Sequence, residues 1–151
     1  VVTVGGIANG KSLAAALILG AEGVMMASRF MATKECVVHN NIKKEIVKRQ
    51  ENDTTLICKS LHLQGRALKN KVVDEICQIE QRGGRFEDLY PLIAGERMKK
   101  AWEEGDVDVA PMMVGQSIGL IHDIPTCKDL LATMAKEAKQ QLSKVSKKFA
   151  G

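Results

Sequence analysis

A chain of 151 residues is long enough for one globular domain with a core of its own. Its residues are 45% hydrophobic and 26% charged, with 3 prolines, and this balance excludes a disordered chain, a collagen-like repeat and a small disulfide scaffold. The net charge of +4 is modest, and only Phe149 accompanies the basic cluster near the end. We therefore expect a solvated helix end there and no nucleic-acid partner. The cluster consists of Lys136, Lys139, Lys144, Lys147 and Lys148.

The four cysteines, Cys36, Cys58, Cys77 and Cys127, lie far apart and form no Cys-x-x-Cys pair. This spacing predicts no metal site, and it favours reduced thiols in the cytoplasm. No apolar run approaches the ~20 residues of a membrane-spanning helix, so we expect no membrane partner. The chain starts at Val1, inside an apolar run and without an initiating Met, and we expect it to be the later part of a longer sequence. The pattern indicates no particular oligomeric state.

The first 28 residues predict a strand, a helix and a second strand. Residues 1–4 are β-branched and apolar, residues 11–19 are good helix formers, and residues 23–27 form a second apolar run. Asn9 or Ser12 is placed to cap the helix, and Gly20 suits its end. Such a unit implies two parallel strands with a right-handed crossover. Because parallel strands need neighbours and helices on both faces, one unit alone cannot complete a barrel.

The rest of the chain is mostly helical in its pattern. Residues 36–50, 70–82 and 91–104 have charged faces with apolar residues three or four positions apart. Residues 53–58 predict a short strand, and residues 105–111 predict a loop. A last helix is expected from about Pro125 towards Lys144.

Glycines follow the first predicted strand and precede the helix. Residues 5–10 read Gly-Gly-Ile-Ala-Asn-Gly, and the second strand ends in Met25, Met26, Ala27 and Ser28. Glycines and small residues at adjacent strand ends let backbone N–H groups approach an anion, as in the phosphate sites of many TIM barrels. The alternative is a tight turn that holds nothing. The pattern matches neither the Rossmann fingerprint nor a P-loop.

Several segments, in order and at family-like spacing, make the chain resemble the nitronate monooxygenase family, formerly called 2-nitropropane dioxygenase, which also contains flavin-dependent enoyl-acyl carrier protein reductases. These segments are Val-Gly-Gly-Ile-Ala-Asn-Gly at 4–10, Leu-Gly-Ala-Glu-Gly-Val at 19–24, Ser-Arg-Phe-Met-Ala-Thr-Lys-Glu at 28–35, Asp-Thr-Thr at 53–55, Gly-Arg-Ala-Leu-Lys-Asn at 65–70, Gly-Asp-Val at 105–107 and Gly-Gln-Ser-Ile-Gly-Leu-Ile at 115–121.

The resemblance implies an α/β fold, the C-terminal part of an FMN-binding TIM (β/α)8 barrel with about its seventh and eighth strands. Its parts would be residues 1–35 at the end of the barrel, a mostly helical small domain over 36–110, and a loop and helix over 111–151 that pack back on the barrel. The FMN phosphate would be held by Gly5, Gly6, Met25, Met26, Ala27 and Ser28. The family's Gln, Gly and Thr are replaced here by Met25, Ala27 and Ser28.

The resemblance assigns no catalytic residue to this chain. In the family, the general base is a histidine in a Gly-His-rich turn on an earlier barrel strand. The histidines of this chain, His39, His62 and His122, all follow its second predicted strand. We therefore expect them to be exposed or packed on helices. Gln116 matches a recurrent Gly-Gln of the family, with either a place near the flavin or a structural role between loop and helix.

The leading hypothesis is an FMN-dependent oxidoreductase that oxidises nitronates or nitroalkanes with O2. The first alternative is an enoyl-acyl carrier protein reductase that uses NAD(P)H and FMN. A barrel of the IMP dehydrogenase type is a second alternative, against which the segments at 53–55, 65–70 and 115–116 argue. The third is a non-catalytic fragment whose helices serve only in packing.

Overall fold

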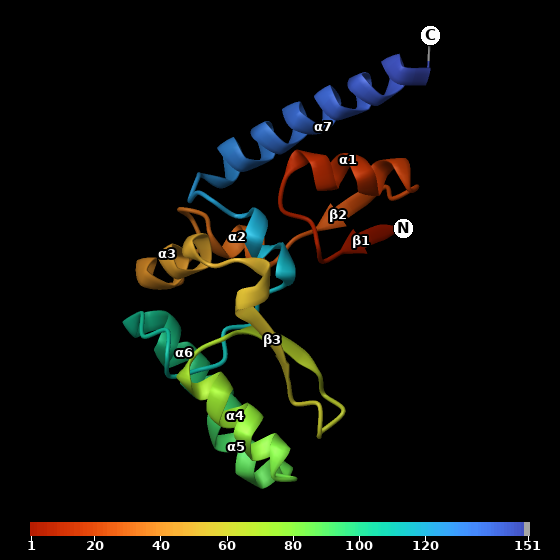
Figure 1. The fold of residues 1–151 in the computed structure, drawn as a ribbon. Helices are drawn as coiled ribbons and strands as arrows, with labels where there is room; N and C mark the ends of the chain where they lie inside the picture. The colour runs from red at the N-terminus through yellow and green to blue at the C-terminus, as the bar shows by residue number, and fades with distance from the viewer. Residues whose placement is uncertain (150–151) are drawn as a thin grey trace.

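The computed structural model describes residues 1–149 and has an α/β fold with two separate two-stranded sheets in that range (Figure 1). The first sheet pairs β1 (Val2–Val4) with β2 (Gly23–Met25), and α1 (Gly10–Ile18) connects them. The strands are parallel, with Val2 opposite Gly23 and Val4 opposite Met25. The predicted strand–helix–strand unit is therefore confirmed.

The boundaries of this unit differ from the predicted ones at β2. The strand ends at Met25 instead of residue 27, and a short helix α2 (Ser28–Met31), absent from the prediction, begins directly after it. At the other end of the crossover, Asn9 caps α1 because its side chain accepts the N–H of Ser12 at 2.9 Å, and the Ser12 hydroxyl in turn accepts the N–H of Asn9 at 3.2 Å.

The last helix, α7 (Cys127–Phe149), lies along α1, so the two ends of the described chain pack together (Figure 1). Ile7 and Ala16 from the first unit form one buried cluster with Leu130 and Met134 of α7. Glu35 caps the start of α7, and both of its carboxylate oxygens accept the N–H of Cys127 at 2.9 Å. This hydrogen bond lowers the pKa of Glu35. The helix extends beyond the predicted end at Lys144.

The second sheet is an antiparallel hairpin of β3 (Thr54–Ile57) and β4 (Gly65–Leu68). The sequence predicted β3 but not β4, because the short segment at 65–68 contains a glycine and an arginine and lacks strand-like alternation. Three helices follow, α4 (Lys71–Gln81), α5 (Phe86–Ile93) and α6 (Gly95–Glu104). The single helix predicted over 91–104 was wrong, since the chain breaks at Ala94 and the residues before it belong to α5.

A central cluster connects the two sheets. Ile42 and Ile46 from α3 (Asn40–Lys48) pack with Ile118 and Ile121, which lie in and directly after the 3-10 helix η2 (Gln116–Leu120). Another 3-10 turn, η1 (Glu51–Asp53), precedes β3 and lies against η2. The predicted loop over 105–111 contains no helix or strand.

The segment that follows this loop runs beside β4. The N–H of Leu68 donates to the Met112 carbonyl at 2.8 Å, and the N–H of Val114 donates to the Arg66 carbonyl at 3.1 Å. Residues 112–114 therefore extend the hairpin and lead directly into η2. The division into parts at residues 35 and 110 stays a prediction.

The parallel sheet has only two strands in the described chain, and its apolar side chains are largely uncovered. Val2 is 59% exposed, Val4 64% and Met25 58%. No helix within residues 1–149 combines the length and the apolar character that a membrane crossing requires.

Candidate functional site

All six residues that the sequence assigned to a phosphate site line one cavity of about 290 Å³. Gly5 and Gly6 follow β1, Met25 ends β2, and Met26, Ala27 and Ser28 lead into α2. The carboxyl ends of both parallel strands thus meet at the same cavity, as expected for adjacent parallel strands. The remaining lining residues are Val4, Ile7, Arg66, Met113, Val114, Gly115 and Ser117.

The glycine turn exposes its backbone to this cavity. Gly5 and Gly6 have φ angles of 82° and 75°, in the left-handed region that residues with a Cβ rarely adopt. A Cβ added at either glycine would meet no atom within 4 Å, so open space faces both residues. Within residues 1–149, no protein group accepts a hydrogen bond from the N–H of Gly6, Ala27 or Ser28. These backbone donors are available to a ligand.

Ser28 connects the strand ends to the segment at the start of η2. Its side chain is 9% exposed, and its Oγ accepts the N–H of Gly115 at 3.0 Å. The hydroxyl proton remains free to donate, since the Ser28 Oγ–H has no acceptor among the described residues. Ser28 therefore supplies a positioned side-chain donor beside the backbone N–H groups.

Arg66 is the charged residue of the cavity lining, and sequence reasoning missed it. It lies in β4, far along the chain from the glycine turn, and only the hairpin brings it to the cavity. The one available signal was the segment Gly-Arg-Ala at 65–67, which the family resemblance already contained. A lining with backbone donors, hydroxyl-bearing residues and one arginine, and without a carboxylate, suits an anion.

The histidines lie outside this cavity. His39 is exposed at the start of α3, where its side chain accepts the N–H of Asn41 at 3.2 Å. His62 is exposed in the β3–β4 turn with a φ of 53°. His122 is exposed beside a different cavity. Gln116 is exposed at the start of η2, while its neighbours on both sides line the first cavity.

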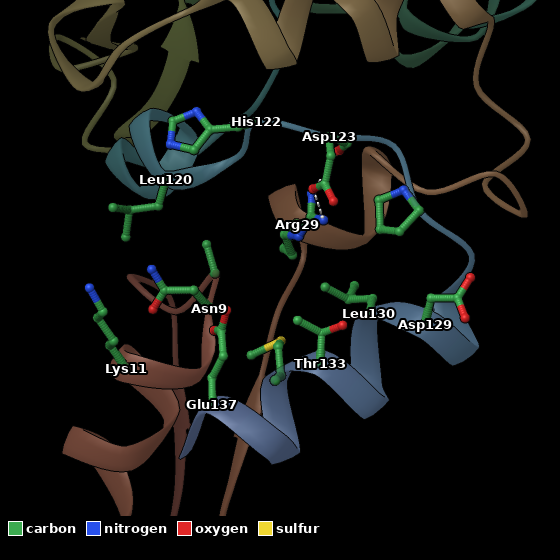
Figure 2. A pocket seen from close by; sticks show the side chains of 13 residues that line it. Asn9, Lys11, Arg29, Leu120, His122, Asp123, Asp129, Leu130, Thr133 and Glu137 are labelled. Atoms are coloured by element: carbon green, nitrogen blue, oxygen red, sulfur yellow. Dashed lines mark hydrogen bonds and ion pairs between the residues drawn. The ribbon is translucent and has the colours of Figure 1, made fainter. Parts of the chain in front are cut away.

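The second cavity, of about 360 Å³, lies between the start of α1, the end of η2 and α7 (Figure 2). Arg29 is 4% exposed and donates to the Asp123 carboxylate at 2.6 Å. The Glu137 carboxylate accepts the N–H of Gly10 at 2.9 Å. Arg29 and Glu137 thus already have protein partners and hold together the elements that surround this cavity.

The described cysteines, and the side chains that could bind a metal, lie outside the first cavity. Burial raises the pKa of the Cys58 and Cys77 thiols, which keeps both protonated at neutral pH. Residues 1–149 contain no group of three or more His, Cys, Asp or Glu side chains arranged to hold a metal ion.

The chain is thus an α/β protein with a cavity, lined by free backbone donors, at the carboxyl ends of two parallel strands. Residues 1–137 match the model of the nitronate monooxygenase family, and the chain belongs to this family. This membership decides against a barrel of the IMP dehydrogenase type.

Relatives and solved structures agree with this assignment. The chain is 28% identical to a nitronate monooxygenase from Neurospora crassa, over 96% of this chain and 39% of that protein. It is 29% identical to a (3aS,4S,5R,7aS)-5-hydroxy-7a-methyl-1-oxo-octahydro-1H-indene-4-carboxyl-CoA dehydrogenase from Rhodococcus jostii, over 91% of this chain and 49% of that protein. The structure of FabK from Thermotoga maritima superimposes with a TM-score of 0.88 at 34% identity, over 96% of this chain and 46% of that one. Nitroalkane oxidase from Streptomyces ansochromogenes shares the fold, with a TM-score of 0.72 at 22% identity, over 95% of this chain and 40% of that one.

The chain spans less than half the length of each of these proteins.

Proposed function

We propose that this chain is the FMN phosphate-binding part of a flavin-dependent oxidoreductase that oxidises nitronates or nitroalkanes with O2. The observation that carries the proposal is the single cavity that collects Gly5, Gly6, Met25, Met26, Ala27 and Ser28. FMN fits its chemistry, because a phosphate needs several N–H and O–H donors and no neighbouring carboxylate. The free N–H groups of Gly6, Ala27 and Ser28 provide such donors.

The proposal extends to the fold. β1 and β2 would be the seventh and eighth strands of a TIM barrel, in which the phosphate site lies at the carboxyl ends of those strands. The exposed side chains of Val2, Val4 and Met25 support this placement, since barrel strands are buried on both sides. The small domain of such an enzyme would begin after the barrel, at about residue 36.

When bound, the flavin supplies the redox chemistry, and the protein supplies position and electrostatics. In this chain, Gly6, Ala27 and Ser28 would hold the phosphate and so fix the position of the flavin. No histidine lines the cavity, so we assign no residue of this chain as the general base. The substrate would be a small nitronate, and the enzyme would be cytoplasmic.

The second candidate is a reductase or dehydrogenase of acyl thioesters, such as the enoyl-acyl carrier protein reductases of the family, with NAD(P)H as a further partner. The relative from Rhodococcus jostii favours it, because that protein is named for a coenzyme A thioester. Both candidates use the same FMN phosphate site, and they differ in the substrate. A non-catalytic packing role is the third candidate.

Gly6→Asp tests the phosphate assignment. We expect FMN to shift the amide NMR signals of Gly6, Ala27 and Ser28 in the wild-type chain, and Gly6→Asp to abolish these shifts, because its carboxylate would face the phosphate. Gly20→Asp is the matched control, since Gly20 also has a positive φ of 93°, also faces open space and does not line this cavity. Equal responses of Gly6→Asp and wild type to FMN would refute the assignment.

A further inference from the structure

Arg66 reaches the proposed phosphate cavity from a different part of the fold than the glycine turn. It lies in β4, and its carbonyl accepts the N–H of Val114, which also lines the cavity. The hairpin and residues 113–117 therefore form one wall, while the ends of β1 and β2 form another. Among all the residues that line the cavity, Arg66 is the one charged residue.

The guanidinium has no acidic partner in the described chain. None of the ion pairs within residues 1–149 involves Arg66. Within residues 1–149, its side chain donates from Nη1 to the Thr54 Oγ1 at 2.9 Å. A guanidinium has several N–H donors in a fixed plane, so most of them are free for a ligand.

Thr54 holds this guanidinium in place without neutralising it. Its side chain is 6% exposed, and its Oγ1 donates to the Glu51 carbonyl at 3.0 Å. That bond uses the hydroxyl proton, so the Thr54 oxygen faces Arg66 as an acceptor. The positive charge is thereby oriented and left uncompensated.

The surroundings strengthen the attraction for an anion. Apolar side chains, including Val4, Met25, Met26 and Met113, make up much of the lining. A carboxylate that would compete with the ligand for Arg66 is absent from the lining.

We propose that Arg66 is a phosphate-binding residue of this cavity, and that it binds a phosphate ester from the side of the β3–β4 hairpin. Two sources share this chemistry: the FMN phosphate itself, or the phosphate of a second nucleotide such as coenzyme A or NADPH. This inference rests on the proposed function, in which the same cavity receives FMN. The planar guanidinium suits two phosphate oxygens at once, which a lysine cannot match.

The test compares wild type, Arg66→Met and Arg66→Lys by NMR titration with FMN, riboflavin, coenzyme A and NADPH. Arg82→Met serves as the control, since Arg82 is exposed at the end of α4 and does not line the cavity. We expect Arg66→Met to weaken binding of a phosphate-bearing probe by about ten-fold or more, Arg66→Lys to recover part of it, and Arg82→Met to match wild type. Riboflavin, which has no phosphate, should respond equally in all four proteins.

The outcomes separate the two sources and the two proposals. If Arg66→Met loses affinity for FMN alone, Arg66 binds the flavin phosphate. If it loses affinity for coenzyme A or NADPH alone, Arg66 binds the phosphate of a second nucleotide. Equal affinities of wild type and Arg66→Met for every phosphate probe would overturn the inference, even where Gly6→Asp abolishes FMN binding. A loss in Arg66→Met together with an unchanged Gly6→Asp would instead uphold Arg66 and reject the glycine turn.

Thr54 supplies a second test that leaves the charge in place. Thr54→Val removes the acceptor that orients Arg66, and we expect it to weaken the same probe that Arg66→Met weakens. Thr54→Ser keeps the hydroxyl and should restore the affinity. An effect of Thr54→Val on riboflavin and on the phosphate probe alike would point to a general structural change and count against the positioning role.

Discussion

At the scale of single residues, Ser28 has a double role. Its oxygen accepts the N–H of Gly115 while its proton stays free for a ligand. The family's threonine at this position carries the same hydroxyl, so the replacement keeps both functions. The change to Ala27 adds a methyl group but leaves its N–H without a protein partner, so the donor is preserved.

We expect Ser28→Ala to destabilise the fold by about 1–3 kcal/mol, because the part-buried N–H of Gly115 loses its acceptor. Chemical denaturation followed by circular dichroism measures this loss. Ser28→Thr should keep most of the stability, and Ser143→Ala, at an exposed site on α7, should be close to neutral. A Ser28→Ala chain as stable as wild type would show that the bond to Gly115 contributes nothing.

At the scale of elements, the sequence predicted the parts that rely on local signals. The apolar runs at 1–4 and 23–27 and the helix formers between them specify β1, α1 and β2 without help from the rest of the chain. β4 could not be predicted, because Gly65–Leu68 becomes a strand only by pairing with β3 and with residues 112–114. The same reason explains why Arg66 was missed, while the glycine turn, whose residues are neighbours in sequence, was recognised.

The contact between α1 and α7 depends on Gly10. A Cβ at this position would collide with the Glu137 side chain and lie 2.6 Å from the Met134 carbonyl oxygen. Gly10→Ala should therefore destabilise the chain by about 1–3 kcal/mol, although alanine is the better helix former. Thermal unfolding measures the effect.

Gly95→Ala is the matched control for this substitution. Gly95 begins α6, and an added Cβ there meets nothing within 4 Å, so alanine should be neutral or slightly stabilising. If Gly10→Ala behaved like Gly95→Ala, the close packing of α7 against Gly10 would not contribute to stability.

At the scale of the whole molecule, the described chain contains the proposed phosphate site but few of the elements that would surround a flavin ring. Charge-assisted hydrogen bonds contribute roughly 1.5–3 kcal/mol each, and immobilising a ligand costs about 4–15 kcal/mol. A TIM barrel has eight strands in ~250 residues, and two parallel strands are present in residues 1–149. The phosphate contacts alone leave little net affinity.

We therefore expect the 151-residue chain to bind FMN only weakly, detectably in an NMR titration but not through purification, and to catalyse neither nitronate oxidation nor enoyl reduction. Flavin absorbance of the purified chain, followed by assays with a nitronate and with an enoyl thioester plus NAD(P)H, tests this. A tightly bound flavin, or turnover above the buffer rate, would contradict the placement of the chain as one part of a barrel.

The packing of α7 on α1 also sets the order in which the chain can acquire its structure during synthesis. α1 precedes α7 by most of the described chain, so the apolar side of α1 waits for its partner while the elements between them are made. Contacts between distant segments form slowly, and surfaces left open meanwhile attract chaperones or other nascent chains. Ile7, the residue next to the glycine turn, is buried in one cluster with Leu130 and Met134. The packing beside the glycine turn therefore depends on a helix that is made well after the turn itself.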